Sequence, residues 1–412
     1  MRHTAILRVL LDMKHVVVEG VEFDREGITL DVRPTTTKPR CGGCYRCCAS
    51  GYDQRPRAWR HLDFAGMEVW LRYSIRRVDC AWCGVTTELV PWAEPDSGFT
   101  RDFEEQTAFL AQRADRTTVS TALRVAWRTV GRIIERVMAR KAPEDRLDGL
   151  RRIGVDEISY RKHHEYLTVV TCHDRGVVVW VGEGKNAEAL GRFFAALGAE
   201  RAALLEIVSI DMSAAYEKAV REHAPKAKIV FDRFHVQRLA SVAVDEVRRG
   251  MMRDAPDDAT RKAIKGTRFS LLRNYENTSV DDRVKLALIR KNAKPLQRAR
   301  LMKETLHETL GESDPKTARV IMRQLIGWAQ RSRLAPFQKL ARTLKAKFEG
   351  VIAYVETGVS NGRIEGLNNK IRSLTKRAYG FHRADSLMSY IMLCCTGLEL
   401  APVRHRPMLA RK

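Results

Sequence analysis

The order of apolar and polar positions divides the chain into a β-rich start, a helical segment, a mixed segment and a long helical stretch. Apolar residues alternate with polar ones at residues 16–23, 28–32 and 68–78, which predicts three strands, the first two joined by a turn at residues 25–27. Between residues 100 and 141 the apolar residues recur every three or four positions instead, which predicts three helices.

Two of these helices have the arrangement of a helix-turn-helix DNA-binding unit. A short helix over residues 117–123 precedes a turn at residues 124–126 and an arginine-rich helix that begins at Trp127. The apolar side chains of that helix should pack inward (Val130, Ile133 and Ile134), and the polar ones should face a DNA groove (Arg128, Thr129 and Arg132). A plain three-helix packing module stays open, because Ala126 occupies the position where a Ser or Thr would cap the helix.

After a charged linker at residues 142–152, the pattern becomes that of a mixed α/β domain. Apolar runs predict strands over 152–159, 166–173, 177–181, 206–211 and 228–232, with helices over 187–205 and 214–223. Three antiparallel strands followed by alternating helices and strands is the order of an RNase H-like domain. Residues 235–356 are basic and follow a helical pattern, which predicts a large helical insertion.

A further helix is predicted from about residue 360. Four apolar residues recur at helical spacing and define its packed face: Ile364, Leu367, Ile371 and Leu374. Ser360 or Asn361 can cap its start, and Gly380 can end it. Glu365 lies beside the apolar stripe near the helix start. A single acid in that position also complements the helix dipole. Glu365 therefore indicates a metal site only in combination with other acids elsewhere in the chain.

Composition points to a polyanionic partner. The chain has 412 residues, enough for two or three domains, and its 73 Lys and Arg against 50 Asp and Glu give a net charge of +23. No run of 18 apolar residues indicates a membrane span, and the first residues lack the pattern of a signal peptide. We therefore expect a cytoplasmic protein that does not bind membranes, in a reducing compartment where cysteines serve as metal ligands or buried thiols.

The cysteines near the start of the chain have the spacing of a zinc site. Two Cys-x-x-Cys pairs, Cys41 with Cys44 and Cys80 with Cys83, offer four thiolates to one structural Zn²⁺ ion. Chance pairing or a redox dithiol is the alternative. Cys47 and Cys48 follow the first pair closely, and either could replace Cys44 with less favourable spacing.

Three acids far apart in the sequence suggest a second metal site. Asp156 lies on the first strand of the mixed domain, Asp211 ends the fourth, and Glu365 lies on the late helix. In an RNase H-like sheet these places converge at one edge, where three carboxylates would repel one another without cations. Oxygen ligands suit Mg²⁺ or Mn²⁺, and two such ions per site can catalyse phosphoryl transfer. Each aspartate alone could equally be a turn residue at a strand end.

Other polar residues lie near these acids. Asp232 ends a strand beside the site and can be a supporting fourth acid, and His235 can contact a phosphate; a helix cap and a packed histidine are the alternatives. Arg363, Lys370 and Arg372 flank Glu365 and are further candidates for DNA phosphate contacts, against a solvated helix face as the alternative.

Several motifs resemble those of the ISL3 family of insertion-sequence transposases, over roughly residues 40 to 390. They comprise the two cysteine pairs, the helix-turn-helix that leads into Trp127-Arg-Thr-Val, Ile-Gly-Val-Asp156-Glu-Ile-Ser, Ser-Ile-Asp211-Met-Ser, Phe-Asp232-Arg-Phe-His235-Val and Ser-Asn-Gly-Arg-Ile-Glu365-Gly-Leu-Asn-Asn-Lys. The resemblance implies a DDE transposase in which Asp156, Asp211 and Glu365 hold the metals. It also implies that the N-terminal arm binds terminal inverted repeats in double-stranded DNA and that the element ends are joined to target DNA. A nucleoid-associated bacterial protein is a further implication of the resemblance.

The resulting expectation is a multidomain α+β protein. Its parts are a zinc-binding domain (1–95), a helix-turn-helix domain (96–142), an RNase H-like α/β catalytic core in two pieces (150–239 and 357–398) interrupted by a large helical insertion (240–356), and a basic tail (399–412). Because two DNA ends must be held together, we expect a homodimer or a higher oligomer on DNA. A catalytically inactive DNA-binding regulator and a nuclease that never joins ends are the competing functions.

Overall fold

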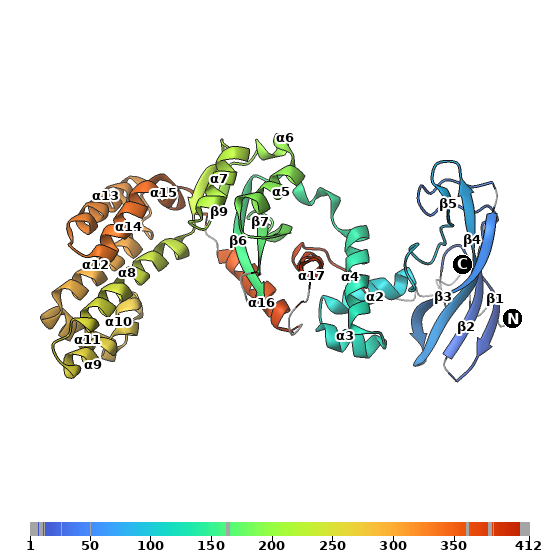
Figure 1. Cartoon of the computed structure of the whole chain (residues 1–412), viewed down its shortest axis with the longest axis horizontal. Coiled ribbons are helices and arrows are strands. Elements are labelled where there is room, and N and C mark those ends of the chain that lie inside the picture. Colours follow the sequence, from blue (N-terminus) through green and yellow to red (C-terminus); the bar gives the residue numbers. More distant parts are fainter. Residues whose placement is uncertain are drawn as a thin grey trace, which may run out of the picture. The chain divides into compact units, whose positions relative to one another are not determined.

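The structure, a computed structural model, describes residues 7, 11, 13–25, 27–49, 51–161, 165–359, 362–377, 381 and 383–403. The chain forms two compact units: residues 1–143 with 377–412, and residues 144–376 (Figure 1). Among the described residues, none of the helices combines the length and the apolar character that a membrane span requires.

The first unit begins with a five-stranded sheet. Its strands are β1 (Val16–Phe23), β2 (Gly27–Pro34), β3 (Gly51–Phe64), β4 (Met67–Cys80) and β5 (Gly84–Thr87), in the order β1-β2-β4-β3 with β5 paired to β4. The long β3–β4 hairpin turns at Ala65 and Gly66, which both have positive φ, as tight two-residue hairpin turns require. Trp59 and Trp92 pack edge to face in the core, with ring centroids 5.5 Å apart. The three strands predicted from alternation are confirmed.

Where the structure describes this unit, the sheet is followed by the helices α2 (Arg101–Ala111), α3 (Arg116–Leu123), α4 (Trp127–Lys141) and α17 (Ala384–Cys395). Val130, Ile133 and Ile134 are buried, as predicted. Helix α17 packs on α4, and the Tyr390 hydroxyl donates a hydrogen bond to the Ala111 carbonyl (2.8 Å). The structure differs here from the sequence-based boundary, which placed residues up to 398 in the catalytic core, because the apolar face of α17 is covered by the helices of the first unit.

The second unit contains the other five-stranded sheet. Its strands are β6 (Arg152–Arg161), β7 (Glu165–Cys172), β8 (Val177–Glu183), β9 (Ile207–Ile210) and β10 (Lys228–Phe231), in the order β10-β9-β6-β7-β8. Strands β6, β7 and β8 form an antiparallel meander, whereas β6, β9 and β10 run parallel. All five strands predicted for the mixed segment are therefore present.

Helices cover both faces of this sheet. Ile153 and Val155 are buried in one core with side chains of α5 (Ala187–Leu197) and α7 (Ala214–His223), and the short α6 (Ala199–Ala202) follows α5. Gly154 points to the opposite face, since side chains alternate along a strand. There it meets α16 (Gly362–Arg377), which lies beside β6 in Figure 1. The predicted apolar stripe of α16 faces inward at Ile364, Ile371 and Leu374, while Leu367 is half-buried.

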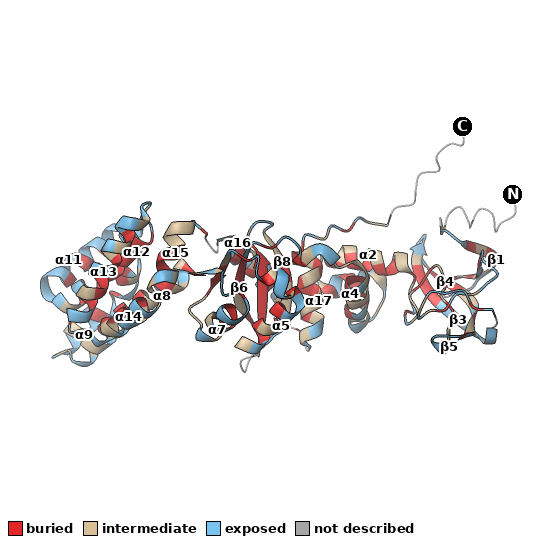
Figure 2. Cartoon of the chain, turned by 90° about the horizontal axis from the view of Figure 1, so that it is seen from above, coloured by how far each residue is buried: buried red, intermediate tan, exposed pale blue. Residues whose placement is uncertain are grey.

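The rest of the second unit is helical. Its helices are α8 (Arg233–Arg253), α9 (Asp258–Lys265), α10 (Arg268–Leu272), α11 (Val280–Asn292), α12 (Lys294–Thr309), α13 (Pro315–Arg331), α14 (Ala335–Ala346) and α15 (Phe348–Thr357), with short 3₁₀ turns at Glu144–Leu147 and Tyr275–Asn277. Figure 2 shows the buried stripes of these helices facing one another. Helix α8 is continuous from residue 233, so the predicted boundary at residue 240 falls inside it. Asp232 caps that helix directly after β10.

Candidate active site and zinc site

Three aspartates follow the same row of the second-unit sheet. The ladder pairs Gly154 of β6 with Ser209 of β9, and Ser209 with Val230 of β10. Two residues after each of these positions comes an aspartate: Asp156 after Gly154, Asp211 after Ser209 and Asp232 after Val230. Since paired residues of parallel strands share a face, this register directs the three carboxylates to one side of the sheet, where the parallel ladder ends.

Local hydrogen bonds hold each of these carboxylates. The Glu157 amide donates to Asp156 Oδ1 (2.7 Å), and the Ser213 amide donates to Asp211 Oδ1 (2.9 Å) in the turn that leads into α7. Asp232 caps α8 and shares a hydrogen bond with His235 Nδ1 (2.9 Å). Hydrogen bonds to nearby residues therefore orient all three carboxylates.

The charges of neighbouring side chains shift the pKa values of Asp156 and His235. Burial raises the pKa of Asp156, and the charges of Asp211 and Asp232 raise it further, while a backbone hydrogen bond and His235 act in the opposite direction. The hydrogen bond that the Asp232 carboxylate accepts from His235 is the main cause that raises the pKa of His235, and the charges of the other two aspartates add to it. The four side chains form one electrostatic cluster, which we call the Asp–His cluster.

Helix α16 closes over this cluster at Gly154 and Asp156. A methyl group added at Gly154 would lie 1.9 Å from Ile364 Cδ1, so the helix rests directly on the strand. One turn further along, Asn368 Nδ2 donates a hydrogen bond to Asp156 Oδ2. The packing of Ile364 and this hydrogen bond together fix the start of α16 against β6.

Glu365 lies one turn before Asn368 and is exposed. Within the described ranges, the four cysteines are the only group of three or more metal-binding side chains with ligand atoms within 4.8 Å of one another. Asp156, Asp211 and Glu365 therefore do not meet that closely in this structure.

The zinc site of the first unit is assembled. The Sγ atoms of Cys41, Cys44, Cys80 and Cys83 lie within 4.8 Å of one another, in the β4–β5 turn and in the loop before β3. Backbone amides of Trp82 and Cys83 lower the pKa of Cys80 to about 6, which favours the thiolate that binds metal. Cys47 is exposed, and Cys48 is buried beside the cluster, so Cys44 completes the set. Four sulfur donors fit a structural zinc ion.

The helix-turn-helix presents two of its predicted DNA contacts. Arg128 and Arg132 lie one turn apart on the exposed face of α4, and Thr129 is half-buried. Arg116 has another role: it is buried, its guanidinium lies 3.6 Å from the Trp127 ring centroid, and burial lowers its pKa to about 10. Arg116 therefore holds α3 against α4, which leaves Arg128 and Arg132 available to an external partner.

Comparison with known families shows which family the chain belongs to. Models of three families match consecutive parts of the chain: a zinc-finger of transposase IS204/IS1001/IS1096/IS1165 over residues 37–83, a helix-turn-helix domain of transposase family ISL3 over 88–138, and a transposase over 153–391. The last match covers more than half of the chain. The chain belongs to the ISL3 family of DDE transposases.

Relatives share nearly the whole length of this transposase. It is 38% identical over 442 residues to transposases for insertion sequence element IS1557 from two strains of Mycobacterium tuberculosis, covering 99% of this chain and 98% of each relative. It is 28% identical over 370 residues to the transposase for insertion sequence element IS1001 from Bordetella parapertussis, covering 88% of this chain and 91% of that relative. The zinc-finger match and the four clustered thiols together support a structural zinc ion in this transposase.

The remaining predicted DNA contacts of the transposase lie around α16 and α8. Lys370 and Arg372 are exposed on α16, and Arg372 Nη1 donates to Asn369 Oδ1 (3.2 Å). His235 is half-buried beside Asp232. The side chain of Arg363 lies outside the described part of the chain, as do the proposed helix caps Ser360 and Asn361 and the proposed helix end at Gly380.

The sequence analysis missed three side chains at the site. Glu157 is half-buried, its pKa is raised by burial, and Lys185 acts against that rise. The Tyr216 hydroxyl, whose pKa burial also raises, lies 2.9 Å from Thr168 Oγ1. Asn368 contacts Asp156 directly. The sequence signal for Glu157 was its position next to Asp156, and for Asn368 its position three residues after Glu365. No feature of the sequence indicated Tyr216.

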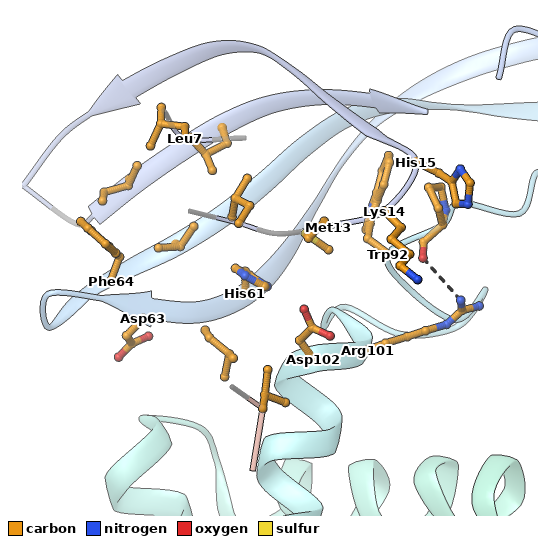
Figure 3. A pocket seen from close by; sticks show the side chains of 17 residues that line it. Leu7, Met13, Lys14, His15, His61, Asp63, Phe64, Trp92, Arg101 and Asp102 are labelled. Carbon is orange, nitrogen blue, oxygen red and sulfur yellow. Dashed lines mark hydrogen bonds between the residues drawn. The ribbon is translucent and has the colours of Figure 1, made fainter. Parts of the chain in front are cut away.

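A cavity elsewhere in the transposase is separate from this chemistry. It has a volume of about 550 Å³ and lies in the first unit between the sheet and the start of α2 (Figure 3). Apolar side chains such as Met13 and Trp92 line it together with Arg101 and Asp102. None of the predicted catalytic, zinc-binding or DNA-binding residues lines it.

Proposed function

We propose that this transposase binds the terminal inverted repeats of its insertion sequence, cleaves the DNA at the element ends and joins those ends to target DNA. The observation that carries the proposal is the row formed by Asp156, Asp211 and Asp232 at the end of a parallel ladder, with α16 packed over it. Three antiparallel strands, followed by two parallel strands on the far side of β6, support an RNase H-like catalytic core.

The proposed metal ligands are Asp156, Asp211 and Glu365, with Asp232 and His235 in support. Carboxylate oxygens suit Mg²⁺ or Mn²⁺, and the mutual repulsion of the aspartates favours binding of cations. Two such ions, when bound, would activate the attacking hydroxyl and stabilise the leaving oxygen in phosphoryl transfer. The backbone amides of Glu157 and Ser213 orient the carboxylates of Asp156 and Asp211, and α16 would carry Glu365 to the cations.

The basic side chains are proposed to hold the DNA. Arg128, Thr129 and Arg132 would contact the terminal repeats, supported by the zinc-stabilised sheet of the same unit. Around the catalytic site, His235, Arg363, Lys370 and Arg372 would contact phosphates near the cleaved bond. The net charge of +23 supports binding of a polyanion. Since two element ends must react together, we propose a homodimer or a higher oligomer on DNA.

The test uses pre-cut terminal-repeat DNA, a target plasmid and Mg²⁺ or Mn²⁺. We expect the wild-type chain to yield joined products and Glu365→Gln to bind the repeat normally without joining it. Glu157→Gln is the matched control, because it makes the same chemical change close to Asp156 on a side chain with no proposed catalytic role.

Other outcomes identify other functions. Specific binding without cutting by the wild-type chain would indicate a DNA-binding regulator, and cutting without joining would indicate a nuclease. Loss of joining in Glu157→Gln but not in Glu365→Gln would transfer the role of third acid to Glu157.

A further inference from the structure

We propose that Asn368 is an additional oxygen donor of the metal centre. Its side-chain amide would hold Asp156 while the site contains no cation, and would turn its oxygen to the cation bound at Asp156. This inference rests on the proposed metal site, and the experiment below separates failure of the inference from failure of that site.

The hydrogen bonding of Asn368 is incomplete in a way that points to a ligand. The side chain is only 3% exposed, its Nδ2 donates to Asp156 Oδ2, and its Oδ1 is buried without a hydrogen-bond partner among the described residues. A buried carbonyl oxygen without a donor is unfavourable, and native structures rarely keep one unless water or an ion satisfies it. Asn368 therefore has an unused acceptor immediately beside a proposed metal ligand.

A side-chain amide can bind either a carboxylate or a cation. Its NH₂ group donates to a carboxylate, and its oxygen is a ligand of the kind that Mg²⁺ and Mn²⁺ accept. Rotation of the amide by half a turn exchanges the two groups without moving the helix. A carboxylate at position 368 would instead add another negative charge to Asp156, Asp211 and Asp232, and an apolar side chain would offer neither group.

The backbone around Asn368 is held in place by packing. Ile364, one turn earlier on the same face of α16, rests on Gly154 of β6, two residues before Asp156. The next residue, Asn369, is exposed. Two adjacent asparagines on one helix therefore differ in whether they face the site, which provides a matched internal control.

The experiment measures Mn²⁺ binding to the full-length, zinc-loaded chain without DNA, by the electron paramagnetic resonance signal of free Mn²⁺. We expect Asn368→Leu to weaken binding about tenfold or more, the size of loss typical of residues that support a metal site. Asn368→Asp should bind Mn²⁺ more tightly than the wild type, because a charged ligand replaces a neutral one. Asn369→Asp should bind like the wild type.

A second readout is the thermal midpoint without Mn²⁺. Asn368→Asp should lower it, because the new charge lies beside Asp156, and Mn²⁺ should restore it more than it shifts the wild type. A midpoint for Asn368→Leu close to that of the wild type would show that the fold survives this change, and circular dichroism checks all variants.

The outcomes are distinguishable. If Asp156→Asn abolishes Mn²⁺ binding and both Asn368 variants bind like the wild type, the role of Asn368 is refuted and the metal site stands. If Asn368→Asp weakens binding as much as Asn368→Leu does, Asn368 only shapes the site and is not a ligand. If Asp156→Asn leaves Mn²⁺ binding unchanged, the proposed metal site itself fails.

Discussion

Replacing Gly154 by alanine tests whether α16, the helix that carries Glu365, rests on β6. The added methyl carbon would lie 1.9 Å from Ile364 Cδ1, 2.9 Å from Ser209 Oγ and 3.1 Å from His173 Nε2. Ser209 and His173 are hydrogen-bonded to each other at 2.7 Å, so neither can move away freely. The strain must therefore be relieved mainly by Ile364 and the helix that carries it.

The magnitude follows from two opposing effects. Forcing an extra methyl group into a packed site costs about 1–3 kcal/mol. Alanine in a strand is otherwise better than glycine by about 0.5–1 kcal/mol, because glycine loses more backbone entropy on folding. We therefore expect Gly154→Ala to weaken the attachment of α16 by about 1–2 kcal/mol.

A second change should reverse the first. Ile364→Val removes the Cδ1 atom that the new methyl group would overlap, and alone it should cost about 0.5–1.5 kcal/mol through a small cavity. In the double variant the alanine methyl group fills that cavity. The double variant should therefore be close to the wild type, with a favourable interaction free energy of about 1.5–3.5 kcal/mol between the two sites.

Native-state hydrogen exchange of the amides in α16 is the suitable assay. Exchange reports the local opening of one helix, whereas a thermal midpoint reports the unfolding of a whole compact unit. Gly250→Ala in α8 is the control, because no atom lies within 4 Å of its added methyl group, and it should leave protection of α16 unchanged. Unchanged protection in Gly154→Ala, or no recovery in the double variant, would refute the placement of α16.

Three further predictions concern the other sites. Cys44→Ser should lose the bound zinc measured by elemental analysis, whereas Cys47→Ser should keep it; zinc retained in Cys44→Ser would point to Cys48 as the fourth ligand. Arg132→Ala should weaken binding to the terminal repeats and reduce the slope of log affinity against log salt by about 0.9, the effect of one lost phosphate contact; an unchanged slope would exclude that contact. Because the pKa of His235 is raised, its ion pair with Asp232 should stabilise the fold fully below about pH 6.5. This stabilisation should decrease as the pH rises through the raised pKa. Thermal midpoints of His235→Gln that fall with pH as steeply as those of the wild type would contradict this.

Local patterns were sufficient to predict most of the elements. Alternation of apolar residues located β1, β2 and β4, and short apolar runs located the five strands of the second sheet, because a strand buried on one or both faces imposes these patterns on its own sequence. The zinc site was equally local. Each Cys-x-x-Cys pair forms its own turn, and the β3–β4 hairpin, in which Gly51 pairs with Val78, returns the chain to the first pair.

The features that were not predicted depend on contacts between distant segments. Helix α17 has an apolar face, but the sequence pattern does not state which helices cover that face, and α4 covers it here. Asn368 reads as an ordinary polar residue of an amphipathic helix. Its importance follows from the contact between Ile364 and Gly154, which turns position 368 toward Asp156.

Charge repulsion makes the exposed position of Glu365 compatible with the proposed metal centre. Two unit charges 4 Å apart cost about 4 kcal/mol near a protein surface, several times the net value of an ordinary hydrogen bond of about 1 kcal/mol. A chain without cations therefore gains by keeping Glu365 in water and placing the neutral amide of Asn368 against Asp156. Bound cations would reverse this balance, because they attract the same carboxylate that the three aspartates repel. We therefore expect Mn²⁺ to increase the protection of the first turn of α16 in the wild type and to leave it unchanged in Asp211→Asn.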